Sequence, residues 1–298
     1  LAGVHSGDSA CIIPSVHITA ENVATIKEYT KKIAEEMHVV GLMNMQYAIE
    51  NGKVYVLEAN PRASRTVPLV SKVCNIRMVP LAIDIVTSEL TGRPSPVPAL
   101  KEQNIPYYGV KEAVFPFNMF PEVDPLLGPE MRSTGEVLGL ADTVGEAFYK
   151  AQEATKSKLP LEGTVLISVS DRDKGEVVEV AKRFKEAGFA ILATGHTKEL
   201  IEQAGIEAER VFKRSEGRPD IYDVITNGKV QLVVNTPKGD EDGPDDSYVR
   251  KACIKSRVPY ITTMAAALAS ADGILAEQKQ EKNEVVSLQE LHSRIREK

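Results

Sequence analysis

Three side chains that carry oxygen ligands lie close together early in the sequence. Glu58 and Asn60 are two residues apart in an apolar run, so on a β-strand their side chains leave the same face. Gln46 lies in the apolar run that comes before. Carboxylate and amide oxygens are ligands that Mg²⁺ accepts, and Mg²⁺ sites usually combine a few protein ligands with nucleotide phosphates. The residue types therefore predict a metal site at Gln46, Glu58 and Asn60.

Two arginines, Arg62 and Arg65, follow this group directly. A guanidinium can clamp a phosphate with two hydrogen bonds and can stabilise the charge of a phosphoryl group in transfer. We predict that role for both. The alternative is that Glu58 and Asn60 end a strand at a polar rim while the arginines form surface ion pairs, because a bare Glu-x-Asn pattern is common. The combination with Arg62, Arg65 and the upstream Gln46 favours a site.

A β-hairpin must position these groups. Residues 42–49 and 54–60 are strand-like, and Asn51-Gly52 between them is a strong turn signal. A two-residue loop with regular pairing would place Gln46 opposite Leu57 and send Gln46 and Glu58 to opposite faces. A shared metal site therefore predicts a loop that is one residue longer, with a bulge assisted by glycine.

A second group of polar residues follows successive apolar strands in the later half of the chain. In an open parallel sheet the carboxyl ends of the strands meet at one crevice, where helix N-termini and hydroxyls bind anions. The alternative is that the threonines only cap a helix and the lysines face solvent. Because these signals share one end of a sheet, we predict a phosphate site formed by Lys174, Thr194, Thr197, Lys213 and Asn235.

The wider pattern predicts an α/β chain with two domains. Apolar periodicity and a cap at Thr19 indicate a helix over 21–37, and Pro80 inside its start and Gly92 past its end indicate a second helix over 80–92. Later, strands at 164–169, 189–193, around 211, 230–235 and 260–262 alternate with helices at 174–187, 197–204, 219–226 and 246–257. Such βα units predict a doubly wound parallel sheet. We place the domains at 1–157 and 158–298, and expect the charged stretch 278–298 to be a solvated helix or a frayed end.

Composition excludes several classes of protein. The 298 residues carry a net charge of −6, which argues against a nucleic-acid surface. No apolar run approaches the length of a membrane span. The three cysteines form no CxxC pair, which favours a reducing, cytoplasmic setting without structural zinc.

Long stretches of the first part resemble the second ATP-grasp half of carbamoyl-phosphate synthetase large chains. They are GVHSGDSA at 3–10, GLMNMQ at 41–46, LEANPRASRTVP at 57–68 and DPLLGPEMRSTGEV at 124–137. The later part is similar to the methylglyoxal-synthase-like fold that closes those chains. The resemblance implies a partial ATP-grasp domain followed by an allosteric domain.

The resemblance also implies an activity: an ATP-dependent ligase that phosphorylates carbamate to carbamoyl phosphate for pyrimidine and arginine biosynthesis. Its cofactors would be ATP with Mg²⁺ or Mn²⁺, and K⁺ as a further ion. Gln46, Glu58 and Asn60 would hold the metals, with Gln46 and Glu58 also at the nucleotide, and Arg62 and Arg65 would bind the phosphoryl group. The nucleotide site would be lined by Gly3, Val4, His5 and Ser6. Because the upstream part of the ATP-grasp domain is missing, we expect this chain alone to be inactive.

Partners follow from the same resemblance. They are a glutamine amidotransferase small subunit and a nucleotide effector, UMP or IMP, bound at the five phosphate-site residues. Pro237 stands where relatives often carry a hydroxyl, which puts contacts there in doubt. Some relatives bind ornithine, for which Asp8, Glu112, Tyr260 and Thr262 are the candidates. A homo-oligomer is left open.

Two other classes of function stay open at this point. The chain could be a pure effector-binding module with the ATP-grasp remnant as a scaffold. It could also be a lyase acting on dihydroxyacetone phosphate, which needs a carboxylate base, and Asp240 in a glycine-flanked loop is the candidate.

Overall fold

The computed structural model describes residues 4–16, 18–97, 100–120, 123–155, 157–237, 244–279 and 285–297. Contacts divide the chain into two compact units. The first contains Ile12–Gly109 and the described part of Glu284–Lys298, and the second contains the described parts of Gly3–Cys11 and Val110–Asn283. Each unit is assembled from separate stretches of chain. The domain boundary between 157 and 158 stays a prediction.

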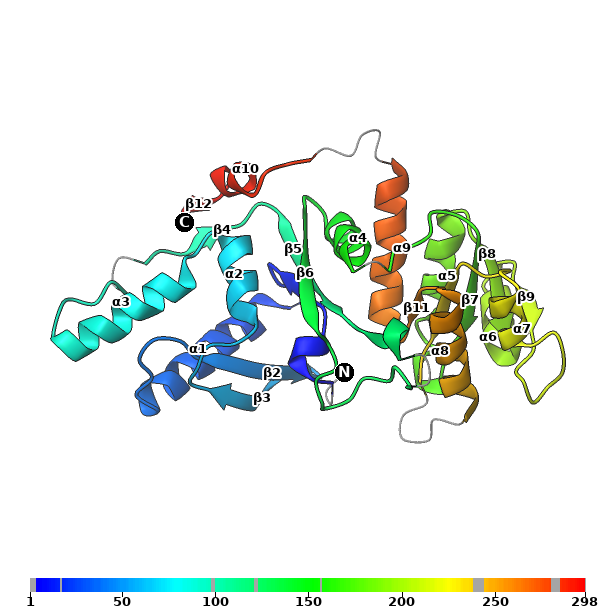
Figure 1. Cartoon of the computed structure of the whole chain (residues 1–298), viewed down its shortest axis with the longest axis horizontal. Helices are drawn as coiled ribbons and strands as arrows, with labels where there is room; N and C mark the ends of the chain where they lie inside the picture. The colour runs from blue at the N-terminus through cyan, green and yellow to red at the C-terminus, as the bar shows by residue number, and fades with distance from the viewer. Residues whose placement is uncertain are drawn as a thin grey trace. The chain divides into compact units, whose positions relative to one another are not determined.

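The first unit holds the predicted hairpin and its helices (Figure 1). Its elements are α1 (Ala20–Glu36), β2 (Asn44–Glu50), β3 (Lys53–Asn60), α2 (Thr66–Cys74), α3 (Met78–Thr91) and β4 (Gln103–Asn104). The two predicted helices and the two predicted strands are confirmed near their predicted bounds, and α2 was not predicted. Thr19 caps α1, because its Oγ1 accepts from the N–H of Asn22 at 3.2 Å. Gly92 ends α3 with φ +68°.

The end of the chain is docked rather than frayed. The helix α10 (Leu288–Ser293) buries Leu291, and the strand β12 (Arg296–Glu297) pairs antiparallel with β4. The ring nitrogen Nε2 of His292 lies 2.6 Å from the carbonyl oxygen of Lys72. The expectation of a frayed end is therefore wrong for the described part, since one buried leucine and a short strand pairing hold it. The alternative of a solvated helix is confirmed in part, because Gln289, Glu290 and Ser293 of α10 are exposed.

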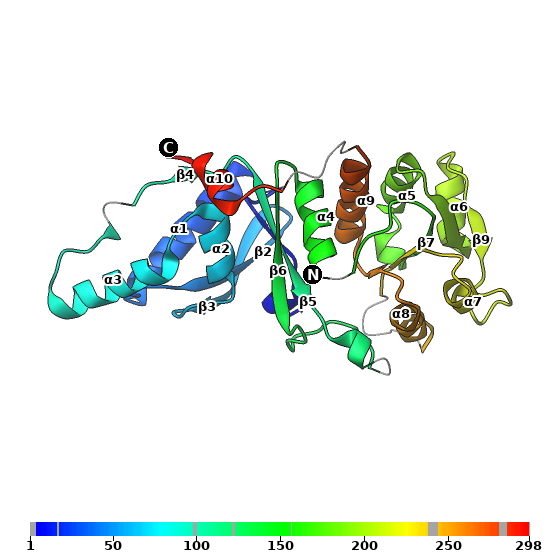
Figure 2. The same ribbon diagram turned by 45° about the horizontal axis from the view of Figure 1, so that its top comes forward.

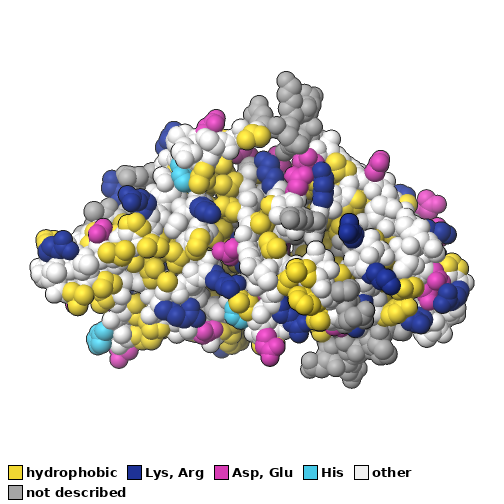
Figure 3. All heavy atoms as spheres, in the orientation of Figure 1, with side chains coloured by type: hydrophobic (Ala, Val, Ile, Leu, Met, Phe, Trp, Pro, Cys, Tyr) yellow, Lys and Arg dark blue, Asp and Glu magenta, His cyan; other side chains and the backbone are white. Residues whose placement is uncertain are grey.

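Helix α3 keeps an apolar face exposed within the same unit. Val79, Ile83, Val86 and Leu90 follow one another at intervals of four, three and four residues, and Leu90 is 79% exposed. Hydrophobic side chains accordingly gather on the surface over α3 (Figure 3). Pro80 and Gly92 predicted the ends of this helix, but they carry no information on which of its faces is buried.

The second unit contains a five-stranded parallel sheet in the order β11-β10-β7-β8-β9. Its strands are β7 (Thr164–Ser168), β8 (Ala190–Thr194), β9 (Glu209–Val211), β10 (Leu232–Asn235) and β11 (Tyr260–Ile261). Helices α5 (Val177–Glu186), α6 (Gly195–Gln203) and α9 (Met264–Lys279) lie on one face, and α7 (Ile221–Thr226) and α8 (Pro244–Ser256) on the other (Figure 2). The predicted doubly wound parallel sheet is confirmed; α9 was not predicted.

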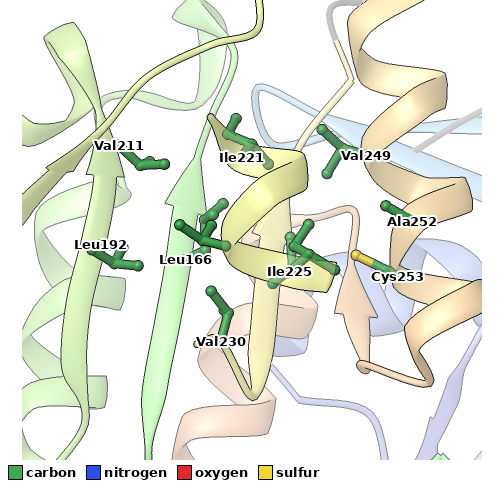
Figure 4. Close-up of a cluster of buried hydrophobic side chains, with 11 residues drawn as sticks. Leu166, Leu192, Val211, Ile221, Ile225, Val230, Val249, Ala252 and Cys253 are labelled. Atoms are coloured by element: carbon green, nitrogen blue, oxygen red, sulfur yellow. The ribbon is translucent and has the colours of Figure 1, made fainter. Parts of the chain in front are cut away.

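The core on the α7 and α8 face joins the strands to those helices (Figure 4). Leu166, Leu192 and Val233 come from three strands, and Ile225 and Cys253 meet them from α7 and α8. Cys253 is fully buried, and burial raises the pKa of its thiol to about 12. This cysteine is therefore a packing residue, not a nucleophile.

The second unit also contains segments from the earlier half of the sequence. They include residues 110–114 of strand β5 (Tyr108–Val114) and the whole of β6 (Gly135–Ala141), and α4 (Val144–Ala154) follows β6. Helices α4 and α9 stand side by side in both views (Figures 1 and 2) and approach closely at two glycines. A Cβ on Gly273 would lie 2.9 Å from the carbonyl oxygen of Gly145. Only glycine permits this approach.

Candidate functional site

The turn of the hairpin is tight. Glu50 pairs with Lys53, so the loop contains only Asn51 and Gly52, with φ +51° and +76°. Positive φ at both positions is the geometry of a type I′ turn, which Asn-Gly favours. The expectation of a longer loop is therefore wrong, because this dipeptide adopts the left-handed turn at little cost.

A bulge inside β3 restores the shared face. Tyr47 pairs with Val56 but Gln46 pairs with Glu58, so Leu57 is an extra residue on β3. The bulge reverses the alternation of side chains beyond it. Gln46 and Glu58 thus lie directly opposite each other on one face, and Asn44 pairs with Asn60 two residues further on.

The three predicted ligands converge at this bulge. The Nε2 of Gln46 donates to Oε2 of Glu58 at 3.1 Å, and the Nδ2 of Asn60 donates to Oε1 of Glu58 at 2.5 Å. Gln46 is partly buried and Glu58 is exposed. A cation would replace the amide donors at the carboxylate. Rotation of each amide by half a turn presents its oxygen instead, at no change in shape. The donor set of one carboxylate and two amides therefore fits a hard cation that also binds phosphate oxygens.

The segment between β3 and α2 carries the two arginines. Arg62 is exposed, and its Nη1 donates to the carbonyl oxygen of Ala63 at 3.0 Å. Arg65 is the N-cap residue of α2, so it stands at the positive end of a helix dipole. Ser64 links the segment to the hairpin, because Nδ2 of Asn44 donates to its Oγ at 3.3 Å. The role of both arginines at a phosphoryl group stays a prediction.

Sequence reasoning did not single out Asn44 and Ser64. Asn44 lies two residues before Gln46 on the same strand, and this period-two spacing could have identified it. Ser64 also lies 2.6 Å, Oγ to Oγ1, from Thr66 at the start of α2. These hydroxyls and the amide of Asn44 fix the segment that presents the arginines.

Of the predicted nucleotide-lining residues, Val4, His5 and Ser6 lie in the second unit. His5 caps the 3-10 turn η1 (Ser6–Asp8), because its Nδ1 accepts from the N–H of Gly7 at 3.0 Å. The N–H of His5 donates to the carbonyl oxygen of Gly128 at 2.8 Å. His5 thus builds the turn, and Gly3 lies outside the described residues. A role of Val4, His5 and Ser6 at the nucleotide stays a prediction.

Four of the five predicted effector residues lie near the carboxyl ends of the parallel strands. Thr194 ends β8 and Asn235 ends β10, Lys174 lies in the turn after β7, and Thr197 lies in the first turn of α6, which follows β8. Thr194, Thr197 and Asn235 are almost fully buried. Thr194 donates to Oγ of Ser168 at 3.2 Å, and Nδ2 of Asn235 donates to the carbonyl oxygen of Ser168 at 3.3 Å. Buried hydroxyls and amides at this sheet edge form one polar group around Ser168, a residue that the sequence did not single out.

Lys174 joins the same edge from the turn after β7. Its Nζ pairs with the carboxylate of Asp171 and lies 2.7 Å from Nδ1 of His196 in the first turn of α6. Thr197 follows His196 in that turn. The fifth residue, Lys213, follows β9, where its N–H donates to Oε2 of Glu216 at 3.3 Å. An incoming phosphate would compete with Asp171 for the ammonium of Lys174.

The candidates for ornithine also lie in the second unit. Both carboxylate oxygens of Asp8 accept backbone N–H groups, from Arg132 at 2.8 Å and from Ser133 at 3.0 Å. Burial raises the pKa of Asp8, and the bonds from Ser133 and Arg132 outweigh it, so the pKa is lowered. Burial raises the pKa of Glu112 to about 7 and that of Tyr260 well above its ordinary value. Binding of ornithine by these residues and Thr262 stays a prediction.

Two features are absent from the described residues. Among them no three histidine, cysteine or acidic side chains gather as ligands for a metal ion. No helix in the described ranges is both long enough and apolar enough to cross a bilayer. Asp240, the candidate base for a lyase, lies outside the described residues.

Two domain families match this chain in succession. Residues 1–91 match the family described as "Carbamoyl-phosphate synthase L chain, ATP binding domain", and residues 176–262 match the "MGS-like domain" family. The chain is thus of the class in which an ATP-binding segment is joined to a methylglyoxal-synthase-like α/β domain.

Relatives extend this match over nearly the whole chain. A carbamoyl phosphate synthase large chain from Acidobacterium capsulatum is 47% identical over 93% of this chain and 26% of its own length. The C-terminal section of such a large chain from Aquifex aeolicus is 44% identical over 98% of this chain and 58% of its own length. The C-terminal section from Methanopyrus kandleri is 47% identical over 92% of this chain and 51% of its own length. This chain resembles the C-terminal portion of carbamoyl phosphate synthase large chains.

The chain spans about a quarter of the full-length relative and about half of the C-terminal sections. Among solved structures, a methylglyoxal synthase from Elizabethkingia anophelis is 24% identical over 38% of this chain and 80% of its own, with a TM-score of 0.31.

Proposed function

We propose that this chain contributes to the phosphorylation of carbamate by ATP, as part of a carbamoyl-phosphate synthase. One observation supports the proposal most: a bulge at Leu57 brings Gln46, Glu58 and Asn60 to one face, with both amides in contact with the carboxylate. The sequence could have formed a regular hairpin here, and regular pairing would have separated the three groups.

The residues suggest separate roles in metal binding and in phosphoryl binding. Mg²⁺ or Mn²⁺, when bound, would neutralise charge on the phosphates of ATP. Gln46, Glu58 and Asn60 would hold it, and Arg62 and Arg65 would bind the phosphoryl group as a carbamate oxygen forms its bond to the γ-phosphorus. The bond from that phosphorus to the β–γ bridging oxygen breaks, which releases ADP and carbamoyl phosphate. Such transfer depends on positioning and charge stabilisation rather than on a covalent enzyme intermediate.

The rest of the proposal concerns assembly and control. Val4, His5 and Ser6 would line the nucleotide site, and K⁺ would bind as a further ion. A glutamine amidotransferase small subunit would supply ammonia, in the cytoplasm, for pyrimidine and arginine biosynthesis. A nucleotide, UMP or IMP, would bind its phosphate at Lys174, Thr194, Thr197, Lys213 and Asn235. The polar side chains gathered around Ser168 support this binding site, since they lie at the carboxyl ends of parallel strands, where anions bind.

The test is carbamoyl phosphate formation from bicarbonate, ammonia and ATP. We expect no turnover by the 298-residue chain alone, and turnover by a polypeptide extended upstream to the length of the C-terminal relatives and supplied with carbamate. Glu58→Gln should abolish it there, and the control Glu50→Gln, at an exposed position of β2, should not. Unchanged activity of Glu58→Gln would refute the site. A parallel assay for methylglyoxal from dihydroxyacetone phosphate tests the lyase alternative.

A further inference from the structure

Helix α8 presents two contact residues on nearly opposite faces. Tyr248 and Arg250 are two positions apart, and each residue turns a helix by about 100°, so their side chains diverge by about 200°. Tyr248 stacks on Tyr222 of α7, with ring centroids 4.5 Å apart. The guanidinium of Arg214 lies over the ring of Tyr248, with its central carbon 4.2 Å from the ring centroid. Arg214 directly follows Lys213, the proposed effector residue after β9.

Arg250 faces a different segment. It is 1% exposed, and its Nε and Nη2 donate to the two carboxylate oxygens of Asp124 at 2.9 Å each. Burial raises the pKa of Asp124, but bonds from Arg250 and Ser247 outweigh it and lower the pKa. A buried, bidentate pair of this kind is rigid, and removal of one partner leaves an uncompensated charge.

Asp124 is connected through Arg132 and Ser133 to the turn η1 (Ser6–Asp8), which His5 caps. Its carbonyl oxygen accepts from Nη1 of Arg132 at 3.0 Å. The backbone N–H groups of Arg132 and Ser133 donate to the carboxylate of Asp8, which ends that turn. The segment 124–133 is thus held at one end by Arg250 and at the other by Asp8, and every residue in this series belongs to the second unit.

We propose that Tyr248 and Arg250 make α8 the mechanical link between the phosphate pocket at Lys213 and the turn at residues 5–8. A phosphate that draws Lys213 inward moves Arg214, which pulls on Tyr248, and the rigid helix transfers the displacement through Arg250 to Asp124. The inference rests on the proposed effector site. Tyr248 and Arg250 are coupling residues in it, and neither touches the ligand.

The experiment measures hydrogen–deuterium exchange of the 298-residue chain with and without UMP, IMP or inorganic phosphate, alongside their affinities by calorimetry. In the wild type we expect a bound probe to slow exchange about fivefold in peptides covering 5–11 and 124–133, a typical coupling between sites. In Arg250→Met the slowing should persist around 174 and 194 and vanish in 5–11. Lys255→Met, with the same charge change at an exposed position of α8, should behave as wild type.

Arg214→Ser serves as the second variant in case Arg250→Met does not fold, because Arg214 is exposed and its loss leaves no buried charge. It should also uncouple 5–11 while exchange around 174 still slows. If either folded variant still slows exchange in 5–11 as wild type does, the link through α8 is wrong although the effector site stands. If no probe binds the wild type, the effector site is wrong and this link falls with it.

Discussion

The proton on Glu112 should make the stability of this protein depend on pH. Burial raises the pKa of this carboxyl on β5 from 4.5 to about 7, against the lowering influence of the Ala113 N–H, Lys111 and Gln152. In the unfolded chain it titrates near its ordinary value. The folded chain therefore holds this proton more tightly, and the difference is worth about 3 kcal/mol at about 1.4 kcal/mol per pKa unit.

The sign follows from the raised pKa. Below pH 4.5 the group is protonated in both the folded and the unfolded state, so it does not make the free energy of unfolding change with pH. As the pH rises to about 7 the unfolded state loses its proton first, so the free energy of unfolding falls. Glu112→Gln keeps the shape and an oxygen that accepts from Gln152, but it carries no titrating group. Relative to wild type it should gain about 3 kcal/mol over this range.

Urea unfolding of both proteins between pH 4 and 8 measures this difference, and the carboxyl carbon shift of Glu112 in NMR gives its pKa directly. The exposed control Glu199→Gln should differ from wild type by a constant amount. A constant difference for Glu112→Gln as well, or an NMR pKa near 4.5, would refute the reasoning that burial governs this carboxyl.

Two further predictions follow from packing and charge. Gly273→Ala should lower the free energy of unfolding by about 1–3 kcal/mol in urea titrations, because its Cβ would overlap the carbonyl oxygen of Gly145. Gly175→Ala, with open space around its Cβ, should cost far less, and an equal loss in both would contradict the close approach. Lys174→Ala should weaken UMP binding in calorimetry about 10- to 100-fold, as expected for a lost charge-assisted bond. The exposed control Lys182→Ala should have no effect, and unchanged affinity in Lys174→Ala would remove that residue from the site.

Local patterns predicted most of the later fold. Each strand of the parallel sheet is a short apolar run, and several helices end at glycines such as Gly188 and Gly205 with positive φ. These signals lie within a few residues of the element they define. Helix α9 was missed because buried small residues such as Ala267, Ala271 and Gly273 pack it, and they give little amphipathic contrast.

The convergence of the three hairpin residues was predicted, but the geometry that brings them together was not. Residue type, spacing and the nearby Gln46 and arginines singled out Glu58 and Asn60, but the register depends on where the extra residue of β3 is accommodated. The Asn51-Gly52 turn favours two residues, so the bulge formed at Leu57 instead of in the loop. The bidentate contact between Asp124 and Arg250 joins residues 126 positions apart, and no local pattern encodes such a distance.

The affinity for Mn²⁺–ATP of the polypeptide extended upstream, measured by electron paramagnetic resonance in wild type and in Glu58→Gln, tests the central claim most directly. A unit charge about 4 Å from a divalent ion in water contributes about 2 kcal/mol, so the loss of the carboxylate should raise the Kd about 30-fold. Glu50→Gln should leave the Kd unchanged. Equal affinity in wild type and Glu58→Gln, or no binding by the wild type, would contradict the assignment of this hairpin as the metal–nucleotide site.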